Sequence, residues 1–454
     1  MSEWLAEWVV GFELDQIDAS SVETAKHAIL DALACTVAGS TEEGSRIVRD
    51  WVGSMTAAPQ AAILGTDERA STALAALANA TAAHALDLDD VAMTMIHPSA
   101  ILVPTLFALA ERGGHTGAEV LAAYVVGFEV MTRICRQINP EHYARGWHSM
   151  QSVGVLGTAA AAARLLGLDQ TRTTHAIAIA ASSSGGIRKN FGSMVKPLHG
   201  GHAAQHGVEA AELASRGFTG GEAILEGRNG FLQVFTAVDD HARLRDAFAA
   251  DAPFELEQSG VALKRFACCG AIHTALDTLE RMRQSPDFDL EAIRRVECRV
   301  NPLTPGILLH PHAHTGLEGK FSMEYSAAVM LLTGKAGLEQ FTDEQAADPR
   351  LRRLMSLVDV VVDEELPIDL AYFATVVTIE FDSGHRVTVR NDAQHGYPHD
   401  PLTGEERHAK VAECSEGILA PSAVAALIRS VESLETAASI DPIVSHLVPS
   451  TESL

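Results

Sequence analysis

The chain has 454 residues, of which 47% are hydrophobic and 20% charged, an ordinary globular balance with length for two or three domains. Its formal net charge of −25 disfavours binding to nucleic acid or to an anionic membrane, because both require a basic protein surface. The six cysteines form no CxxC motif, so we expect no zinc ribbon. The sequence shows neither a basic leader nor a long uncharged apolar run, so we expect no signal peptide and no transmembrane helix. Together these features predict a cytoplasmic protein.

Helical periodicity dominates roughly the first 260 residues. The first long helix is expected to be capped by Ser20 or Ser21. Gly154 and Gly157, among alanines, would allow a neighbouring helix to approach closely. The predicted helices span residues 20–38, 70–86, 99–112, 117–136, 149–166, 171–183 and 201–216.

The pattern changes after about residue 265. We expect a strand over 293–300, and a β-hairpin over 374–390 that turns at Asp382-Ser383-Gly384. Further helices are expected over 270–284, 323–333 and 404–431. The sequence therefore predicts a mainly α fold, in which residues 1–265 and 396–454 form a large all-helical domain and residues 266–395 form an inserted, smaller α+β lid domain.

The segment HALDLDDVAMTMIHPSA (84–100) combines acidic residues with a histidine in an otherwise apolar context. Asp87, Asp89 and Asp90 precede His97, and Pro98 moves His97 out of the helical region at the entry of the next helix. Three interpretations of this segment are compatible with the sequence: a metal site, an acid/base site and a solvated helix end. The spacing of the aspartates does not fit an EF-hand.

Two lysines and a second histidine are further candidates. His148 stands just before a helix, where it either serves a site or is bonded to a carbonyl group. Lys196 lies in FGSMVKPLHGGHAAQHG (191–207), read as a Gly- and His-rich loop; without a Walker pattern, nucleotide binding is disfavoured. Lys264 lies at the junction of the two parts, where a solvated lysine is the alternative.

Two other clusters suggest chemistry less strongly. Cys268 and Cys269 are adjacent in an apolar segment, which is typical of inert core thiols. His310, His312 and His314 alternate as on one face of a strand, an arrangement that can bind zinc. No carboxylate or cysteine follows them at a ligand spacing, and no HExxH or GxSxG motif occurs, so no metal is expected.

Six segments in order along the chain resemble the MmgE/PrpD family, which includes 2-methylcitrate dehydratase, cis-aconitate decarboxylase and iminodisuccinate epimerase. The resemblance implies a homodimer with a cleft between the two domains that holds a small anionic polycarboxylate, without metal, flavin or nucleotide. The matching segments are HALDLDD with HPS (84–99), HYARGWHSMQSVG (142–154), NFGSMVKPLHGGHAA (190–204), LEGRNGF (225–231), ALKRFACCGAIH (262–273) and LEGKFSMEYSAA (317–328).

Site residues follow from the resemblance, motif by motif. Two positions depart from the decarboxylase pattern: Val91, where that pattern has Thr, and Cys269, where it has His. Both changes remove polar groups and disfavour decarboxylation of cis-aconitate. The implied catalytic residues are Asp87, His97, His148, Lys196, Lys264 and Tyr325. The residues expected to bind substrate are Lys196, Lys264, Arg265, Tyr325 and His273.

Reactions of this family share the movement of a proton at a carbon next to a carboxylate. The lysines would stabilise the enolate-like intermediate, while His97 and His148 would act as base and acid. Asp87 would orient one imidazole, and Tyr325 would bind a carboxylate or protonate a leaving group. We therefore expect a cofactor-independent, 2-methylcitrate dehydratase-like lyase. An iminodisuccinate epimerase-like isomerase, a cis-aconitate-type decarboxylase, a non-catalytic carboxylate-binding protein and a zinc hydrolase are the alternatives.

Overall fold

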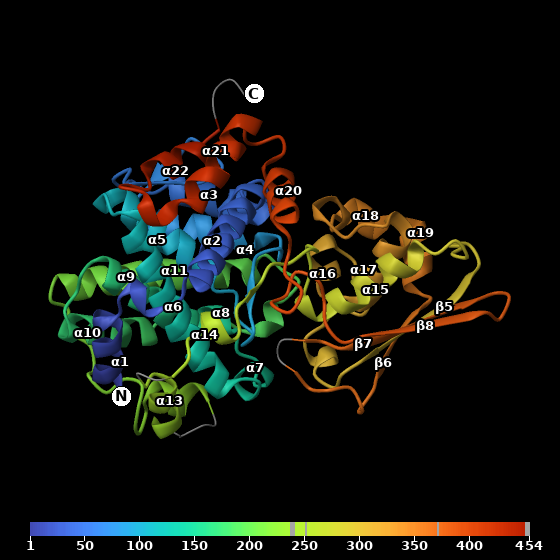
Figure 1. Cartoon of the computed structure of the whole chain (residues 1–454), viewed down its shortest axis with the longest axis horizontal. Coiled ribbons are helices and arrows are strands. Elements are labelled where there is room, and N and C mark those ends of the chain that lie inside the picture. Colours follow the sequence, from blue (N-terminus) through green and yellow to red (C-terminus); the bar gives the residue numbers. More distant parts are fainter. Residues whose placement is uncertain (237–240, 250–251, 370–371, 450–454) are drawn as a thin grey trace.

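A helical lobe and a smaller lobe with a sheet make up the protein (Figure 1). The computed structural model describes residues 1–236, 241–249, 252–369 and 372–449. Both ends of the chain lie in the helical lobe, where α11 occupies the centre and packs against α4, α9 and α10. The helices of this lobe before residue 260 are α1 (Ser2–Gly11), α2 (Ala19–Gly39), α3 (Glu43–Gly53), α4 (Thr72–Ala85), α5 (Ser99–Gly113), α6 (Gly117–Ile138), α7 (Glu141–Ala144), α8 (Ser149–Ser152), α9 (Gly154–Leu165), α10 (Gln170–Ala181), α11 (Val195–Ser215), α12 (Phe231–Phe235), α13 (His241–Ala247) and α14 (Glu255–Gln258).

Most of the helices predicted before residue 260 are confirmed within a few residues, but three details differ. Asp18, and not Ser20 or Ser21, caps α2, because its side chain accepts a hydrogen bond from the Ser21 amide. The predicted helix over 149–166 is broken at Val153 into α8 and α9. The predicted loop at Lys196 is the first turn of α11, where Pro197 is tolerated because its missing N–H has no intrahelical partner there.

Glycine allows the central helices to touch along their backbones. A Cβ atom on Gly157 of α9 would lie 2.8 Å from the Gly127 carbonyl oxygen of α6. A Cβ atom on Gly201 of α11 would lie 2.8 Å from the Leu77 carbonyl oxygen of α4. Both distances are too short for any larger residue. The close approach of α11 to α4 brings Lys196, at the start of α11, to the end of α4.

The smaller lobe contains a four-stranded sheet in the order β6-β5-β7-β8. The central strand β5 pairs in parallel with β6 and antiparallel with β7, and β7 and β8 form the predicted hairpin. Helices α15 and α17 pack against this sheet. The strands are β5 (Ile293–Val300), β6 (Val358–Val362), β7 (Thr375–Phe381) and β8 (Arg386–Asn391), and the helices are α15 (His273–Arg283), α16 (Gly316–Gly319), α17 (Met323–Thr333), α18 (Asp343–Ala347) and α19 (Pro349–Met355).

The chain then returns to the helical lobe. Helices α20 (Gly404–Ser415) and α21 (Pro421–Glu432) both pack against α2, and α22 (Asp441–His446) follows them. The predicted single helix over 404–431 is thus two helices, since Pro421 begins the second one. The mainly α fold is confirmed, whereas the domain limits at 265 and 396 stay predictions.

Two short β-ladders complete the helical lobe. One joins β1 (Ala61–Ala62) to β2 (Arg69–Ala70), and the other joins β3 (Val91–Ala92) to β4 (Val261–Ala262). The second ladder matters for function, because it holds the segment after Asp90 beside the segment that leads to Lys264.

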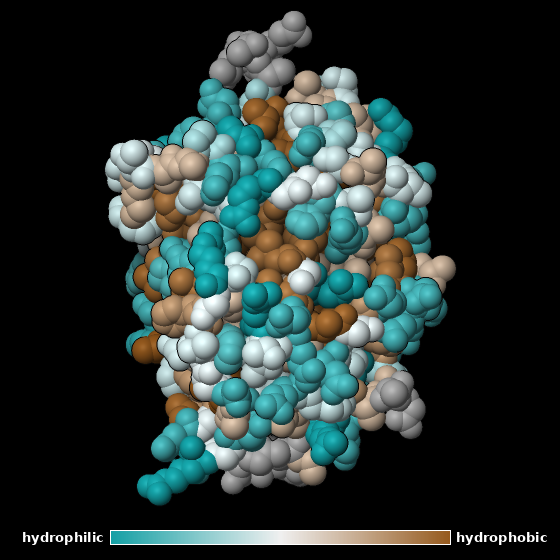
Figure 2. All heavy atoms as spheres, turned by 90° about the vertical axis from the view of Figure 1, so that its left-hand side faces the viewer, coloured by the Kyte–Doolittle hydropathy of each residue, from teal (hydrophilic) through white to brown (hydrophobic). Residues whose placement is uncertain are grey.

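The outer face of the helical lobe, on the side away from the smaller lobe, mixes polar and apolar side chains, with apolar ones gathered near its centre (Figure 2). Among the described residues, none of the helices has both the length and the apolar character that a membrane span requires. The homodimer implied by the resemblance stays a prediction.

Candidate active site

Five of the predicted site residues line a single cavity: Asp87, His97, His148, Lys196 and Lys264. The cavity has a volume of about 60 Å³, enough for several water molecules. The helical lobe supplies these five side chains, and Phe321 and Phe373 of the smaller lobe complete the wall.

Asp87 lies in a strained turn directly after α4. Its φ angle of 52° is left-handed, which costs a non-glycine residue about 1–2 kcal/mol. The buried carboxylate accepts a hydrogen bond of 2.6 Å from the Lys196 ammonium and lies 3.1 Å from the Lys264 ammonium. Burial opposes the negative charge, yet the two lysines hold the pKa of the Asp87 carboxyl well below its usual range. Asp87 is therefore ionised, and it fixes both ammonium groups.

Lys264 is fully buried and also contacts the backbone at Asp87. Its ammonium donates a 2.8 Å hydrogen bond to the Asp87 carbonyl oxygen. Although burial works against its charge, Asp87 and Asp89 raise the pKa of Lys264 above the ordinary lysine value. The lysine stays charged, so the cavity holds a permanent cation beside Asp87.

His84 is a site residue that the sequence interpretation missed. Its Nδ1 lies 2.9 Å from an Asp89 oxygen, and its Nε2 lies 2.6 Å from the Lys196 ammonium. Because an ammonium group only donates, Nε2 accepts and Nδ1 carries the proton. Burial lowers the pKa of His84 to about 4, in agreement with a neutral ring. His84 precedes Asp87 by about one helical turn, and this spacing was the sequence feature that could have identified it as a site residue.

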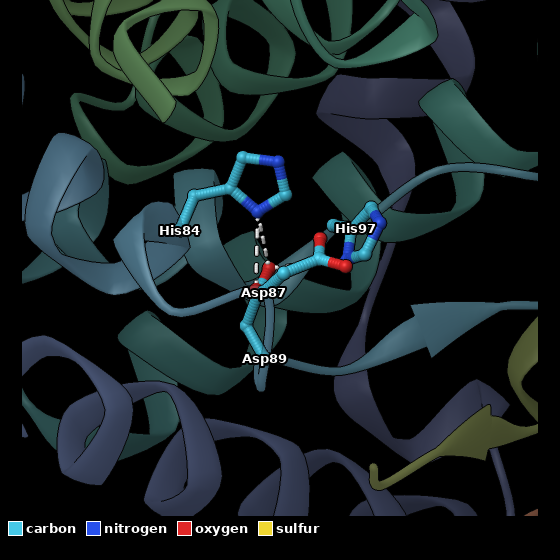
Figure 3. Close-up of side chains that lie close together, drawn as sticks. All are labelled: His84, Asp87, Asp89 and His97. Carbon is cyan, nitrogen blue, oxygen red and sulfur yellow. Dashed lines mark hydrogen bonds and ion pairs between the residues drawn. The ribbon is translucent and has the colours of Figure 1, made fainter. Parts of the chain in front are cut away.

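Asp89, and not Asp87, orients the imidazoles. One carboxylate oxygen of Asp89 lies 2.9 Å from His84 Nδ1 and 3.1 Å from His97 Nδ1 (Figure 3). Burial works to raise the pKa of Asp89, but the two histidines hold it well below the usual range. The prediction that Asp87 orients a ring is corrected, because the lysines already occupy its carboxylate. With Nδ1 facing Asp89, Nε2 of His97 remains for proton transfer.

Replacing Asp89 with asparagine is expected to lower kcat by about tenfold to a hundredfold, because the negative carboxylate 3.1 Å from His97 Nδ1 becomes a neutral amide. The carboxylate raises the pKa of His97, so the acid limb of the pH–rate profile is expected to move to lower pH in the variant. Steady-state kinetics from pH 4 to 8 measure both effects. Asp382→Asn, an exposed change in the β7–β8 turn, is the control. A lowered kcat with an unmoved acid limb would contradict the orienting role.

Asp90 has a structural role in the same segment. Its carboxylate accepts hydrogen bonds from the Ser99 amide at 3.1 Å and the Ser99 hydroxyl at 2.6 Å. These bonds satisfy polar groups at the start of α5. The Asp90 carboxylate therefore anchors the helix that begins beside His97.

His148 forms a pair with a second histidine that the sequence interpretation missed. Its Nδ1 lies 2.9 Å from Nδ1 of His199, so one ring donates and the other accepts. Burial is the main reason that the pKa of His148 lies well below its ordinary value. Burial also lowers the pKa of His199 to about 4. His199 follows Lys196 by one helical turn on α11. The spacing K-P-L-H is the sequence signal that could have identified it.

Three predicted residues lie outside the cavity. The Tyr325 side chain is buried in the core of the smaller lobe, where its hydroxyl donates a 2.8 Å hydrogen bond to the Gln340 carbonyl oxygen. Arg265 pairs with Asp277 at 2.7 Å and with Glu280. His273 Nε2 lies 3.2 Å from the Cys268 carbonyl oxygen. The structure thus places Tyr325, Arg265 and His273 outside the cavity lining, and their expected contacts with substrate stay predictions.

Most of the remaining wall is apolar and includes Val91, Met95 and Ile307, but Tyr143 and Tyr397 also line the cavity. Cys269 also lines the cavity, whereas Cys268 is fully buried. Burial raises the pKa of the Cys269 thiol, so the group is protonated and is no nucleophile. Burial together with these apolar neighbours strengthens the electrostatic interactions of the lysines.

A metal ion does not fit the polar cluster as it stands. The ligand atoms of His84, Asp87, Asp89 and His97 lie within 4.8 Å of one another, a spacing found in metal sites. However, the Lys196 ammonium is bonded to both His84 and Asp87, and a cation there would meet it at close range. The segment with His310, His312 and His314 is an irregular loop with a turn at 311–312 and no strand, and His310 Nε2 is 2.7 Å from the Phe191 carbonyl oxygen.

Comparison with known proteins assigns the chain to a family. Residues 3–243 match the MmgE/PrpD N-terminal domain and residues 266–436 match the MmgE/PrpD C-terminal domain. The chain is 29% identical to a cis-aconitate decarboxylase of Homo sapiens over 450 residues, which covers 96% of this chain and 92% of the relative. It is 27% identical to a cis-aconitate decarboxylase of Aspergillus terreus over 466 residues, which covers 98% and 95%. The chain therefore belongs to the MmgE/PrpD family.

Proposed function

We propose that the chain is a lyase that acts on a small polycarboxylate by proton transfer at a carbon next to a carboxylate group. The observation that carries the proposal is the cavity itself, in which two ammonium groups and two neutral imidazoles surround one ionised aspartate. Such a site attracts an anion although the whole chain carries a net charge of −25. Substrates named for the relatives, such as cis-aconitate, belong to this chemical class.

The residues divide into charge stabilisers and proton carriers. Abstraction of a proton next to a carboxylate creates an enolate-like anion, which the Lys196 and Lys264 ammonium groups stabilise without reorganisation. His97 and His148 are neutral in the empty cavity and so accept protons. A bound polycarboxylate raises the pKa of nearby imidazoles, so the ring that accepts a proton can return it later. In a dehydration the anion expels hydroxide, which leaves as water with the returned proton. In a decarboxylation CO₂ leaves instead of a proton, and the carbanion left behind takes a proton from a protonated imidazole.

The relatives named cis-aconitate decarboxylase favour loss of CO₂, although Val91 and Cys269 depart from the decarboxylase pattern. Proton NMR in D₂O with cis-aconitate, 2-methylcitrate, citrate, tartrate and iminodisuccinate tests the proposal. New alkene signals with release of CO₂ identify a decarboxylase, and new alkene signals without CO₂ identify a dehydratase. Inversion with deuterium uptake would show an epimerase instead. Tight binding measured by calorimetry without any turnover would show a carboxylate-binding protein and contradict the proposal.

The pH dependence of turnover provides a prediction. Burial lowers the pKa of His97 below its ordinary value of 6.5, with Asp89 opposing the shift and the lysines adding to it. The neutral ring is the active base, so on the acid side kcat/KM is expected to keep its neutral-pH value down to about pH 6.5. It then falls as the pH drops through the pKa of the free enzyme. A pH–rate profile whose acid limb begins above pH 7 would contradict this assignment of the base.

A further inference from the structure

Lysine ammonium groups bind three consecutive backbone carbonyl groups in the turn that carries Asp87. We call residues 86–88 the Asp87 turn. Lys320 donates to the Leu86 oxygen at 2.8 Å, Lys264 to the Asp87 oxygen at 2.8 Å, and Lys410 to the Leu88 oxygen at 2.9 Å. Lys264 already belongs to the cavity described above. Lys320 and Lys410 do not line that cavity, and the proton transfer does not use them.

The turn needs such donors because it ends a helix in an unusual way. The last carbonyl groups of a helix lack intrahelical partners and carry partial negative charge. Many helices solve this with a glycine in the left-handed conformation just after the end. Here Asp87 adopts that conformation with φ of 52°, at the cost of backbone strain. Strained residues of this kind persist where their surroundings hold them in place.

The two outer lysines come from distant parts of the chain. Lys320 directly follows α16 in the smaller lobe, and it also donates to the Ala267 oxygen at 3.1 Å. Lys410 lies on α20 in the returning C-terminal segment, where it pairs with Asp31 of α2 at 2.5 Å. The Asp87 turn is therefore the point where the helical lobe, the smaller lobe and the C-terminal helices are bonded together.

Using the buried Lys320 ammonium to bond a carbonyl group lowers the stability of the fold. The Lys320 side chain is buried. Among the described residues, no carboxylate oxygen lies within 4.0 Å of its ammonium group, the longest distance for an ion pair. Its ammonium lies 5.0 Å from the centre of the Phe341 ring. Burying a charge without a carboxylate partner lowers stability, so folding alone does not account for a lysine at this position.

We propose that Lys320 and Lys410 are positioning residues, which hold the Asp87 turn and thereby set the Asp87 carboxylate between Lys196 and Lys264. This inference rests on the proposed function, since the carboxylate has to be positioned only if the cavity is catalytic. It predicts that a change at Lys320, outside the cavity, disturbs the reaction without removing any group that contacts the substrate.

The matched experiment compares Lys320→Met with Lys335→Met. Both changes remove an ammonium group in the same region of the smaller lobe, but Lys335 is exposed. For Lys320→Met we expect kcat to fall by about tenfold to a hundredfold with KM much less affected, because a misplaced catalytic group slows the chemical step. Hydrogen exchange, followed by mass spectrometry, is expected to quicken in the peptide over residues 84–97. Lys335→Met is expected to match the wild type in both measurements.

The pH profile separates positioning from a merely structural role. Burial lowers the pKa of Lys320 to about 8, and Glu42, Asp87, Cys268 and Lys264 are the charged or titratable groups that act on it. Deprotonation leaves an uncharged amine, whose hydrogen bonds to the two carbonyl groups are weaker, so wild-type turnover is expected to fall as the pH rises through about 8. Lys320→Met, which has no such proton to lose, is expected to lack that alkaline limb. An unchanged limb in the variant would overturn the proposal.

The outcomes distinguish the two proposals. If the wild type turns over a polycarboxylate and Lys320→Met retains wild-type kcat and wild-type exchange, the positioning role is wrong and the proposed function stands. If the wild type turns over none of the compounds, the proposed function fails, and the exchange of residues 84–97 alone decides whether the lysines hold the turn. If Lys320→Met does not fold, Lys410→Met gives the same test of exchange and kcat from α20.

Discussion

Replacing Lys196 with methionine is expected to lower kcat/KM by about a hundredfold to a thousandfold, because a fixed cation at the developing negative charge is lost. The Lys196 ammonium lies 2.6 Å from Asp87 and 2.6 Å from His84, so the change also releases both of these groups. Breaking such a buried ion pair costs about 3–5 kcal/mol of unfolding free energy. Steady-state kinetics and thermal unfolding measure the two effects.

The control for this variant is Lys189→Met. Lys189 is exposed in the segment that leads into α11, so the same chemical change is expected to leave kcat/KM and the melting temperature unaltered. Binding of the polycarboxylate should weaken only in Lys196→Met, which calorimetry detects. Turnover within tenfold of the wild type in a folded Lys196→Met would remove Lys196 from the catalytic machinery.

Replacing His97 with asparagine is expected to lower kcat by about a hundredfold to ten-thousandfold, the range for loss of a general acid or base. The ring is 15% exposed and contacts Asp89 through Nδ1, which leaves Nε2 as its free nitrogen. The variant is expected to remain folded, since Asp89 keeps its bond to His84. Kinetics in D₂O with detection of deuterium at the substrate carbon measure the loss of proton abstraction.

An exposed histidine supplies the comparison for His97. His385 lies at the turn between β7 and β8, and His385→Asn is expected to behave as the wild type. Deuterium uptake that continues at the wild-type rate in His97→Asn would show that another group abstracts the proton. His148 would then be the base, and His148→Asn would be expected to stop the uptake.

Local patterns predicted most of the elements, because their determinants are close in sequence. The period of the apolar residues predicted α2, α4, α5 and α6, and alternation predicted β5 with its limits at Ile293 and Val300. The errors occurred where a local pattern permits two structures. Val153 does not look like a helix breaker, and a proline such as Pro197 reads as a loop residue unless the helix is known to begin beside it.

The candidate site was predicted in part, and the reason for the remainder is physical. Motifs identified Asp87, His97, His148, Lys196 and Lys264, which the structure brings to one cavity. Tyr325, Arg265 and His273 share the same motifs, but packing within the smaller lobe satisfies them elsewhere. His84 and His199 were missed because their roles depend on side chains from other segments that pack against them. The spacing of residues along one helix does not predict which side chains these are.

The sequence by itself determined the mainly α fold, the family and the types of side chain available for catalysis, since these depend on residue order and local spacing. Only the tertiary structure decided which aspartate has which role. Asp87, Asp89 and Asp90 are nearly adjacent, yet one binds lysines, one orients imidazoles and one caps a helix. The left-handed turn at Asp87 and the contacts from α11 and α5 separate these roles, because they aim each carboxylate at a partner distant in the chain.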